Sequence, residues 1–529
     1  MSTTVAPPRP TAPRRSGIHW AVAAGLGLLS VGAALGVAHL VAGIVSPGSS
    51  PFISVADAVV RLSPSWLTEF GKSLGPVWDK LLLKIGVAVV LVVVAAVAGI
   101  LGRHRPEPAT RIIMGLGVIG FLAVVLAPTF SPLDLIAPAV ALGAGVLAFR
   151  QLHRRALAVH VEGPGAPAAG GVSRRTVLLS SSAAVGVLGL GAGAAGELLG
   201  RGLVDSRAAV TARLAQLPLA ERAPALPAGA AFPESGTPTF LTANADFYRI
   251  DVALRIPSQA AESWKLRIHG MVGKEISLTF DDLLARRLVE RPITMTCVSN
   301  PVGGDLISTA NFIGVELRDI LLEAGVRPGA DQILTTSVDG WTAGTPTDVV
   351  MEPGRGALLV VGMNGEALPP EHGFPVRMVV PGLYGYVSGT KWITDMELTT
   401  FAARSGYWID RGWSARGPVK TEARIDLPSD RATVPAGRVT VAGIAWSQPT
   451  GISKVEVRMD GGPWQVADLS TEVSTSTWRM WRREFTLAPG SHTVQTRATD
   501  HKGVTQTEEA ADVVPDGATG WPATLFTVA

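Results

Sequence analysis

The sequence predicts a multi-domain protein with a five-helix transmembrane region, an α+β domain and a C-terminal β-sandwich. Only 17% of the 529 residues are charged and the mean hydropathy is +0.31, whereas roughly a quarter of the residues in a soluble globular chain are charged. Residues 1–200 contain 15 Lys and Arg against 7 Asp and Glu, but the remaining residues contain 31 against 36. An apolar, basic part is therefore joined to an acidic part that is expected to be soluble.

Five weakly charged stretches predict transmembrane helices in the N-terminal part. A spanning helix needs about 20 mostly apolar residues. The expected spans are about 18–45, 81–102, 112–129, 133–149 and 176–198. They occupy a region from residue 18 to residue 200.

Basic residues between the stretches predict their orientation, because Lys and Arg near helix ends collect on the cytoplasmic side. Arg14 and Arg15 precede the first span, and further arginines lie between the second and third spans and between the fourth and fifth. Residues 1–17 are therefore expected in the cytoplasm. After five crossings, everything from residue 201 onwards is expected outside it, in a multi-pass protein of the cell membrane.

A pair of arginines precedes the last span. Arg174 and Arg175 lie in the segment 173–179, and a weakly hydrophobic run rich in Gly and Ala follows. This pattern is typical of a twin-arginine export signal, which serves domains that fold before they cross. Two ordinary positive-inside arginines are the alternative interpretation.

The membrane region is not expected to bind haem. His39 is the only histidine well inside an expected span. A haem held across a helix bundle by histidines needs two facing imidazoles. The spans are therefore interpreted as an anchor.

The outer part divides into three segments. Residues 201–236 are rich in Ala and Pro and predict a linker. In 237–425 short strand-like runs alternate with short helical stretches, which is typical of an α+β domain. In 426–529 the pattern is purely β, with about seven short strands, and Asp460-Gly461 is a hairpin turn signal.

Cys297 is the only cysteine and lies where an apolar strand gives way to a Gly-rich loop. A single cysteine excludes an internal disulfide and a site built from several thiolates. A lone cysteine is more often a small buried apolar residue. At a strand end, however, its thiolate can point into a cleft and bind a soft transition metal.

A second cluster of candidate residues follows about 75 residues later. His372, Arg377 and Lys391 flank a strand and a glycine turn. Arg can grip a phosphate in a fork, Lys adds a point charge, and glycine amides approach the oxygens. The cluster therefore predicts an anionic, phosphorylated ligand, with surface charges beside a turn as the alternative.

Together these segments resemble the sulfite oxidase family of molybdopterin-dependent oxidoreductases. The resemblance is to a polytopic, membrane-anchored bacterial member of the actinobacterial type, with an internal twin-arginine signal. It covers residues 237–529. The segments that carry it are 244–248, 291–301, 307–321, 372–391 and a C-terminal domain similar to the family's immunoglobulin-like dimerisation module.

The resemblance implies a role for each matching residue. Cys297 matches the thiolate ligand of molybdenum in a molybdenum-molybdopterin cofactor, which makes it both the metal ligand and a catalytic residue. Tyr384 resembles an active-site tyrosine of the methionine sulfoxide reductase branch. The implied cofactor-binding residues are Asn244, Phe247, Tyr248, Asp339, His372, Arg377, Gly389, Thr390 and Lys391.

The activity implied is two-electron oxygen-atom transfer on a small extracytoplasmic substrate, either sulfite or a sulfoxide or N-oxide. Sulfite-oxidising members have an arginine pair after the asparagine of the cysteine loop. Here Asn300 is followed by Pro301, Val302 and Gly303, which weakens sulfite as the substrate. Arg411 and Arg416 either restore positive charge or, as we expect, tie the domain junction together.

A separate electron-transfer partner, a quinone or a cytochrome, is expected. So is a homodimer formed through the C-terminal domain, whereas no nucleic-acid partner is expected. The alternative function is a catalytically inactive, membrane-tethered binding module that retains the fold. The sequence leaves open the substrate, the direction of reaction, the electron acceptor and the role of the loop 46–80.

Overall fold

The computed structural model describes residues 18–45, 49–64, 78–127, 130–161, 201–253, 256–257 and 259–529. The chain divides into two compact units, Met1–Arg201 and Gly202–Ala529. The expected fifth span at 176–198, the Arg174-Arg175 motif and the N-terminal residues 1–17 lie outside the described residues.

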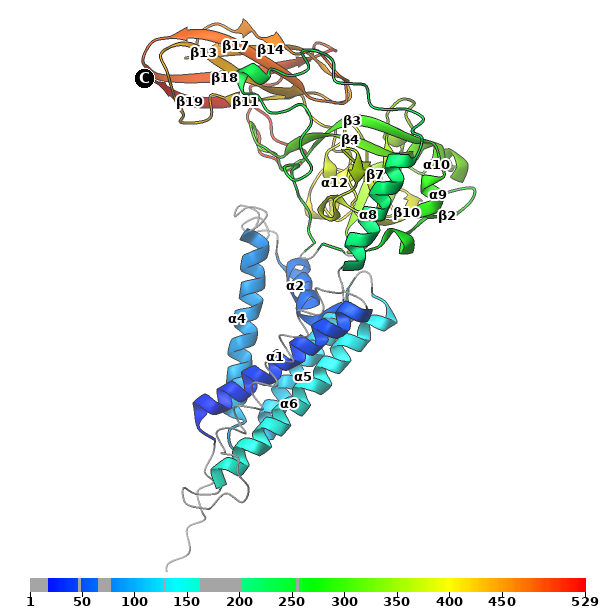
Figure 1. Ribbon diagram of the computed structural model, residues 1–529, viewed down its shortest axis with the longest axis vertical. Helices are drawn as coiled ribbons and strands as arrows, with labels where there is room; N and C mark the ends of the chain where they lie inside the picture. Colours follow the sequence, from blue (N-terminus) through cyan, green and yellow to red (C-terminus); the bar gives the residue numbers. More distant parts are fainter. Residues whose placement is uncertain are drawn as a thin grey trace, which may run out of the picture. The chain divides into compact units, whose positions relative to one another are not determined.

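Among its described residues, the N-terminal unit contains four helices that are long and apolar enough to cross a membrane (Figure 1). They are α1 (Trp20–Val45), α4 (Trp78–Leu101), α5 (Pro106–Val125) and α6 (Ile136–Val161). The unit also contains the shorter α2 (Pro51–Leu62) and the 3-10 turn η2 (Pro132–Leu135). Apolar side chains such as Val89, Val90 and Val93 are exposed on α4, as expected of a surface that faces lipid.

The boundaries of two helices differ from the prediction. Helix α6 continues to Val161, whereas the expected span ends at residue 149. Arginines end the apolar stretch there, but Arg and Ala are good helix formers, so the helix itself continues. Helix α5 begins at Pro106 rather than at residue 112, because proline is well tolerated in the first turn of a helix.

Helices α1 and α4 approach each other closely at two glycines. A Cβ atom built on Gly27 would lie 2.0 Å from the carbonyl oxygen of Ala95. A Cβ atom on Gly99 would lie 2.0 Å from the carbonyl oxygen of Ala23. Any side chain at either position would push the helices apart, so the crossing depends on both glycines.

Basic segments meet at one end of this unit. The backbone N–H of Ile18, just before α1, donates to the carbonyl of Arg103, just after α4 (3.1 Å). His153 Nε2 on α6 donates to the carbonyl of Gly102 (2.8 Å). The start of α1, the end of α4 and the arginine-rich part of α6 therefore lie together.

The expected linker 201–236 begins instead with a helix that packs on the second unit. In α8 (Arg201–Gln216), Val210 and Leu214 belong to the main core. The chain that follows adds backbone contacts, because Ala220 N donates to Leu288 O and Glu290 N to Glu221 O (2.8 Å each). Ala-rich composition favours helix, and apolar residues four positions apart supply the face that packs.

Shortening the buried leucine of α8 is expected to destabilise the second unit. Leu214 is 5% exposed, so Leu214→Ala should lower the free energy of unfolding by about 2–4 kcal/mol. Arg213→Ala is the matched control. Its ion pair with Asp281 is largely exposed, so its loss should cost less than about 1 kcal/mol. Thermal unfolding of the full chain in detergent measures the loss of stability in both variants. Equal losses for Leu214→Ala and Arg213→Ala would support the prediction that residues 201–236 form a linker.

The α+β part of the second unit contains two five-stranded sheets that share one core. The first sheet has the order β2-β1-β10-β5-β6, in which only β1 and β10 are parallel. Its strands are β1 (Lys265–Gly270), β2 (Ile276–Thr279), β5 (Gln332–Ser337), β6 (Thr342–Pro346) and β10 (Ile393–Thr399).

The second sheet has the order β3-β4-β7-β8, with β9 paired to β7. Its strands are β3 (Leu288–Thr296), β4 (Ile307–Glu316), β7 (Leu358–Met363), β8 (Glu366–Ala367) and β9 (Arg377–Val379). The short helices are α9 (Phe280–Leu284), α10 (Leu317–Ala324), α11 (Thr347–Met351) and α12 (Gly385–Ser388). The 3-10 turns are η3 (Pro233–Ser235), η4 (Ala261–Ser263), η5 (Pro370–His372) and η6 (Ile409–Arg411).

The C-terminal part consists of two sheets around a second core (Figure 1). One has the order β11-β13-β17-β16 and the other the order β12-β19-β18-β14-β15. The strands are β11 (Glu422–Leu427), β12 (Thr433–Val434), β13 (Gly437–Trp446), β14 (Ile452–Met459), β15 (Gln465–Val466), β16 (Asp468–Leu469), β17 (Arg479–Leu487), β18 (Gly490–Asp500) and β19 (Ala523–Val528).

The start of β11 and the turn after β14 can be compared with the predicted domain boundary and the predicted hairpin turn. Strand β11 begins at Glu422, so the expected boundary between 425 and 426 divides a strand that belongs to this part. Asp460 and Gly461 have φ values of +51° and +69°, as the predicted hairpin turn between β14 and β15 requires.

The C-terminal part packs against the strands that lead to Cys297. Trp446 and Trp478 form a small core with Phe240 and Ile307. The backbone N–H of Trp478 donates to Thr294 Oγ1 (2.7 Å), and Trp478 Nε1 donates to Phe240 O (3.1 Å). These contacts attach β3 and the segment around Phe240 to the C-terminal part.

Candidate active site

Cys297 lies in the loop between β3 and β4 and is 8% exposed. Its backbone N–H donates to Leu306 O (3.0 Å), and Leu306 N donates to Asn300 Oδ1 (2.9 Å). A Cβ atom on Gly304 would lie 2.5 Å from Asn300 Oδ1, so this tight loop needs glycine there. The loop therefore fixes the thiol at the end of β3.

The segment 244–248 lies beside this loop. Tyr248 N donates to Ser308 Oγ on β4 (3.1 Å). Burial raises the pKa of Tyr248, the negative charge of Cys297 raises it further, and Arg377 lowers it. The Tyr248 hydroxyl therefore stays protonated at neutral pH, and a Cβ atom on Gly385 would lie 3.7 Å from it.

His372 is held in a defined tautomer. Its Nε2 atom lies 3.1 Å from the carbonyl oxygen of Asn244, so Nε2 carries the proton. Burial, followed by the charges of Arg377 and Lys391, lowers the pKa of His372 to about 3. The neutral ring thus has a lone pair on Nδ1, and this buried atom has no hydrogen-bond partner among the described residues.

Asn244 and Phe247 position this histidine. Asn244 Oδ1 accepts from Asn364 Nδ2 (2.8 Å), and Asn244 Nδ2 donates to Glu366 Oε1 (2.6 Å). The Phe247 ring meets the His372 ring edge to face, with 5.3 Å between the ring centroids. Segment 244–248 and η5 are therefore locked together, although they are far apart in the sequence.

Arg377 is a buried cation at the start of β9, and within the described part of the chain it forms no ion pair with a carboxylate. Burial lowers its pKa to about 10. Its Nη1 donates to His372 O (3.1 Å) and its Nη2 to Gly389 O (3.5 Å). A Cβ atom on Gly389 would lie 3.3 Å from Arg377 Nη2 and 2.9 Å from the carbonyl of Gly385.

Lys391 is paired with a carboxylate that the sequence did not point to. Its Nζ lies 3.3 Å from Asp251 Oδ2 and donates to Glu371 O (2.9 Å). Arg249 Nε donates to the same Asp251 oxygen (2.7 Å). Burial lowers the pKa of Lys391 to about 8, and Asp251 acts against this shift. The side chain of Asp251 is only 5% exposed, so one buried carboxylate serves two cations.

Two other predicted cofactor residues lie near Lys391 with their polar atoms engaged. The hydroxyls of Thr390 and Thr335 are hydrogen-bonded to each other (2.6 Å). Asp339 Oδ1 accepts from Trp341 N (3.2 Å). Burial, and to a smaller extent the charge of Asp251, raises the pKa of Asp339. The Thr390 carbonyl accepts from Met378 N (2.9 Å), so only the backbone N–H of Thr390 is left for a ligand.

The structure directs Tyr384 away from the other predicted residues. Its hydroxyl accepts from Lys420 N (3.3 Å). A Cβ atom on Gly517 would lie 2.7 Å from the same oxygen. Tyr384 therefore faces the junction with the C-terminal part, and Cys297 is the last of the charges that influence its pKa.

The residues around Cys297 fit an anionic, polar cofactor. Arg377, Lys391 and Arg249 are cations, whereas Asp251 is the only carboxylate ion-paired to any of them within the described residues. Several buried polar atoms lack partners there, namely Thr296 Oγ1, Asn300 Nδ2, His372 Nδ1 and Arg377 Nε. Buried polar groups are nearly always satisfied, so a ligand with both donors and acceptors fits this site.

Removing the carboxylate beside Lys391 is expected to affect the cofactor-free protein most. Asp251→Asn leaves Lys391 and Arg249 without a counter-charge, which should lower the free energy of unfolding by about 2–4 kcal/mol. A bound phosphate would restore negative charge, so the loaded protein should lose less. Thermal unfolding of protein made with and without cofactor synthesis measures the difference. Asp281→Asn is the control, because its carboxylate is 78% exposed. Equal losses for Asp251→Asn in the cofactor-free and loaded protein would contradict the assignment of Lys391 to a phosphate.

Comparisons with known proteins found a matching family model and related chains. Residues 253–408 match the family model "Oxidoreductase molybdopterin binding domain". Human mitochondrial sulfite oxidase is 30% identical over 306 residues, which cover 49% of this chain and 55% of that protein. YuiH, an uncharacterized oxidoreductase of Bacillus subtilis, is 33% identical over 154 residues, covering 29% of this chain and 74% of that protein. The chain thus spans about half the length of the curated sulfite oxidases it matches.

A solved structure also resembles the chain. The sulfane dehydrogenase SoxCD of Paracoccus pantotrophus has 21% identity and a TM-score of 0.48, covering 55% of this chain and 84% of that chain. The family model and the curated relatives define a molybdopterin-binding oxidoreductase. The chain belongs to the same family of molybdopterin-binding oxidoreductases as YuiH and is similar to the sulfite oxidases.

Proposed function

We propose that this chain is a membrane-anchored oxidoreductase that carries out two-electron oxygen-atom transfer on a small substrate outside the cytoplasm. The observation that carries the proposal is the group of cations formed by Arg377, Lys391 and Arg249, in which Arg377 is 3% and Lys391 11% exposed. Arg377 is buried without a carboxylate partner among the described residues and adds no net stability to the fold, so a binding module without its cofactor has no use for this cation. Retention of the whole cluster therefore supports an active enzyme over the inactive alternative.

A molybdenum-molybdopterin cofactor, when bound, supplies a metal that changes its oxidation state by two electrons and exchanges an oxygen atom. In this proposal Cys297 binds the metal through Sγ. Lys391 and the backbone N–H of Thr390 would hold the phosphate, whereas the N–H of Gly389 donates to Gly385 O (2.8 Å). His372 would accept a hydrogen bond from the cofactor at Nδ1, and the protonated Tyr248 hydroxyl would donate one.

The arrangement of cations favours a neutral oxide over sulfite. Arg411 Nη1 donates to Tyr407 O (2.8 Å), and its guanidinium lies over the Tyr407 ring. Arg416 forms an ion pair with Asp348. Both arginines thus have partners within the α+β part, and the loop after Asn300 contains no cation through Gly304. A sulfoxide or N-oxide needs hydrogen-bond donors rather than a pair of cations.

The proposed topology places residues 1–17 in the cytoplasm and the catalytic unit outside it. The meeting of the basic segments at one end of the helical unit supports this orientation. A fifth span after a twin-arginine signal would export the folded domain. A quinone or cytochrome would exchange electrons with the site, and an immunoglobulin-like C-terminal module would form a homodimer.

Metal analysis combined with an activity panel tests the proposed function. Purified full-length protein should contain close to one molybdenum per chain and turn over a sulfoxide or N-oxide with an artificial electron donor. Sulfite, tested with an electron acceptor, should be the poorer substrate. Protein that binds no molybdenum, or binds it and turns over none of these compounds, would support the inactive binding module instead.

A further inference from the structure

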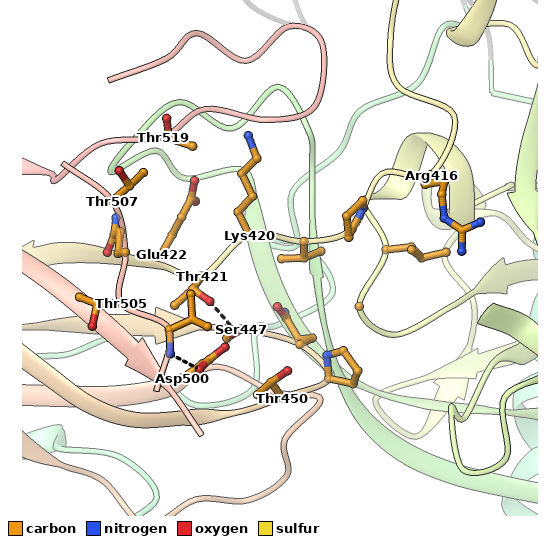
Figure 2. A pocket seen from close by; sticks show the side chains of 18 of the residues that line it. Arg416, Lys420, Thr421, Glu422, Ser447, Thr450, Asp500, Thr505, Thr507 and Thr519 are labelled. Atoms are coloured by element: carbon orange, nitrogen blue, oxygen red, sulfur yellow. Dashed lines mark hydrogen bonds between the residues drawn. The ribbon is translucent and has the colours of Figure 1, made fainter. Parts of the chain in front are cut away.

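A cavity of about 580 Å³ lies where the α+β part meets the C-terminal part of the second unit (Figure 2). Leu383 and Val419 line it from the α+β part, and Gln448 and Thr505 line it from the C-terminal part. Pockets that bind small organic molecules have volumes of about 300–1,000 Å³. Cys297 is not among the described residues that line this junction pocket, so the pocket is a candidate for a second binding site.

Glu422 is a buried acid that lines the junction pocket. It is the first residue of β11 and is 4% exposed. Its Oε1 atom has no hydrogen-bond partner among the described residues, and the neighbouring cation Lys420 pairs with Asp516 instead (2.8 Å). Buried polar atoms nearly always have a partner. The carboxyl group of Glu422 therefore indicates a ligand that donates hydrogen bonds.

Two further buried polar atoms of the lining lack partners within the described part of the chain. Gln448 is 4% exposed, and its Nε2 donates to Thr294 O (3.2 Å), but its Oε1 has no partner. Arg355 Nε has none either. A Cβ atom on Gly382 would lie 2.9 Å from Arg355 Nη1 and 3.0 Å from Gln448 O, so these residues meet at one point of the wall. With Glu422, the unpartnered atoms are two acceptors and one donor.

The strand register brings Glu422 and Gln448 to the same edge of one sheet. Glu422 pairs with Trp446, the last residue of β13. The next pair outwards is joined through its side chains, because the hydroxyls of Thr421 and Ser447 are hydrogen-bonded to each other (2.7 Å). Gln448 follows directly after Ser447. The two residues with unpartnered acceptor atoms therefore lie at the start of β11 and just beyond the end of β13.

The cations around the pocket are already neutralised. Each of the three lining cations forms an ion pair with a carboxylate outside the lining, namely Arg355 with Glu352, Arg416 with Asp348 and Lys420 with Asp516. The second lining acid is Asp500, whose Oδ1 accepts from the backbone N–H groups of Lys502 and Val504 (2.9 Å each). Within the described residues, the charges left to a ligand are therefore those of two acids, Glu422 and Asp500.

The rest of the lining suits an organic cation rather than a metal ion. Leu383, Val419 and Val504 supply apolar surface for a carbon chain. Hydroxyl oxygens can accept from an ammonium group, and six hydroxyl side chains line the pocket, those of Thr421, Ser447, Thr450, Thr505, Thr507 and Thr519 (Figure 2). No group of three or more His, Cys, Asp or Glu side chains that could hold a metal ion occurs in the part of the chain that the structure describes.

We propose that the junction pocket binds a small aliphatic ammonium compound, whose charged nitrogen donates a hydrogen bond to Glu422 and whose carbon chain contacts the apolar wall. The ligand would join the α+β part to the C-terminal part, because both parts line the pocket. This inference goes beyond the proposed function and does not depend on it, since none of the predicted cofactor-binding or catalytic residues lines the pocket.

Ionisation of Glu422 should accompany binding. Burial raises the pKa of Glu422 to about 8, while Lys420 acts in the opposite direction, so the empty pocket contains mostly the neutral acid at pH 7. Tyr384 stays protonated beside it, because burial and then the charge of Glu422 raise the pKa of its hydroxyl. A bound cation favours the carboxylate form of Glu422, so the acid releases its proton to solvent as the ligand binds. Affinity should therefore rise with pH up to about pH 8.

Equilibrium dialysis of the full-length protein in a non-ionic detergent against radiolabelled putrescine, an aliphatic diamine, tests the site. The wild type should bind about one putrescine per chain at pH 8, with a Kd of about 1 mM or lower. Binding should be about 10-fold or more weaker at pH 6, where Glu422 is protonated, although alkylammonium groups stay charged at both pH values. Unlabelled butanediol, the uncharged counterpart of putrescine, should not displace the label at equal concentration.

Glu422→Gln keeps the shape of the side chain but removes its charge. It should weaken putrescine binding at pH 8 by about 10-fold or more and abolish the dependence on pH. Glu484→Gln makes the same change at a carboxylate 54% exposed on β17 and should bind as the wild type does. If Glu422→Gln fails to fold, Val504→Arg replaces it, because Val504 lines the pocket but is 59% exposed. The added cation should weaken binding several-fold.

Three results would overturn the proposal. They are no putrescine binding by the wild type, equal displacement by butanediol, and wild-type affinity in Glu422→Gln or, where that variant does not fold, in Val504→Arg. None of them bears on the molybdenum content or turnover of the protein, so the proposed function stands or fails separately.

Discussion

Cys297→Ser is expected to lower turnover by about three orders of magnitude or more and to reduce the molybdenum content of the protein. A thiolate is a soft ligand that ionises readily, whereas a serine hydroxyl stays protonated at neutral pH and is a hard ligand. The side chains are similar in size and Cys297 is only 8% exposed. The free energy of unfolding should therefore change by less than about 1 kcal/mol.

The measurements are metal content, turnover on the best compound of the panel, and thermal unfolding of the cofactor-free protein. Ser299→Ala is the matched control, because it changes the same loop two residues away without removing a proposed ligand. It should keep metal and turnover close to the wild type. A serine variant with unchanged metal content and turnover would remove Cys297 from the reaction.

Sequence reasoning located the parts of the site that depend on local patterns. An apolar run that ends at a Gly-rich loop predicted Cys297 at a strand end, and the structure has β3 ending at Thr296. The His372–Lys391 block was recognisable because its residues lie within one short stretch. Its members do meet in the structure, through Arg377 with His372 and through Gly373, where a Cβ would lie 3.1 Å from Lys391.

The parts that sequence reasoning missed depend on contacts between distant segments. Asp251 meets Lys391 across 140 positions, and nothing in either segment indicates this pairing. Glu422 looks like an ordinary strand residue, and its burial follows from the docking of two domains. Tyr384 was assigned by resemblance, but its direction is set by Lys420 and Gly517. Composition also misled, because the Ala-rich residues after 200 form a docked helix.

Arg377 shows how the site balances folding against binding. Its pKa falls from 12.5 to about 10, so keeping it charged costs the cofactor-free protein about 3 kcal/mol. Its hydrogen bonds to His372 O and Gly389 O act in the other direction, at about 1–3 kcal/mol for each buried carbonyl. These magnitudes nearly cancel. The charged Arg377 side chain therefore changes the free energy of unfolding very little, and its role is to attract an anionic ligand.

Arg377→Met is accordingly expected to separate cofactor binding from stability. The free energy of unfolding of the cofactor-free protein should stay within about 2 kcal/mol of the wild type, because the relieved charge offsets the two lost hydrogen bonds. Molybdenum per chain should fall about 10-fold or more, since a tenfold change in occupancy needs only about 1.4 kcal/mol. Arg416→Met, at an arginine 57% exposed, is the control and should retain the metal. A methionine variant that is strongly destabilised but binds molybdenum normally when refolded would show that Arg377 serves only the fold. A cation needed for the anionic cofactor could not be replaced by an apolar side chain without loss of binding.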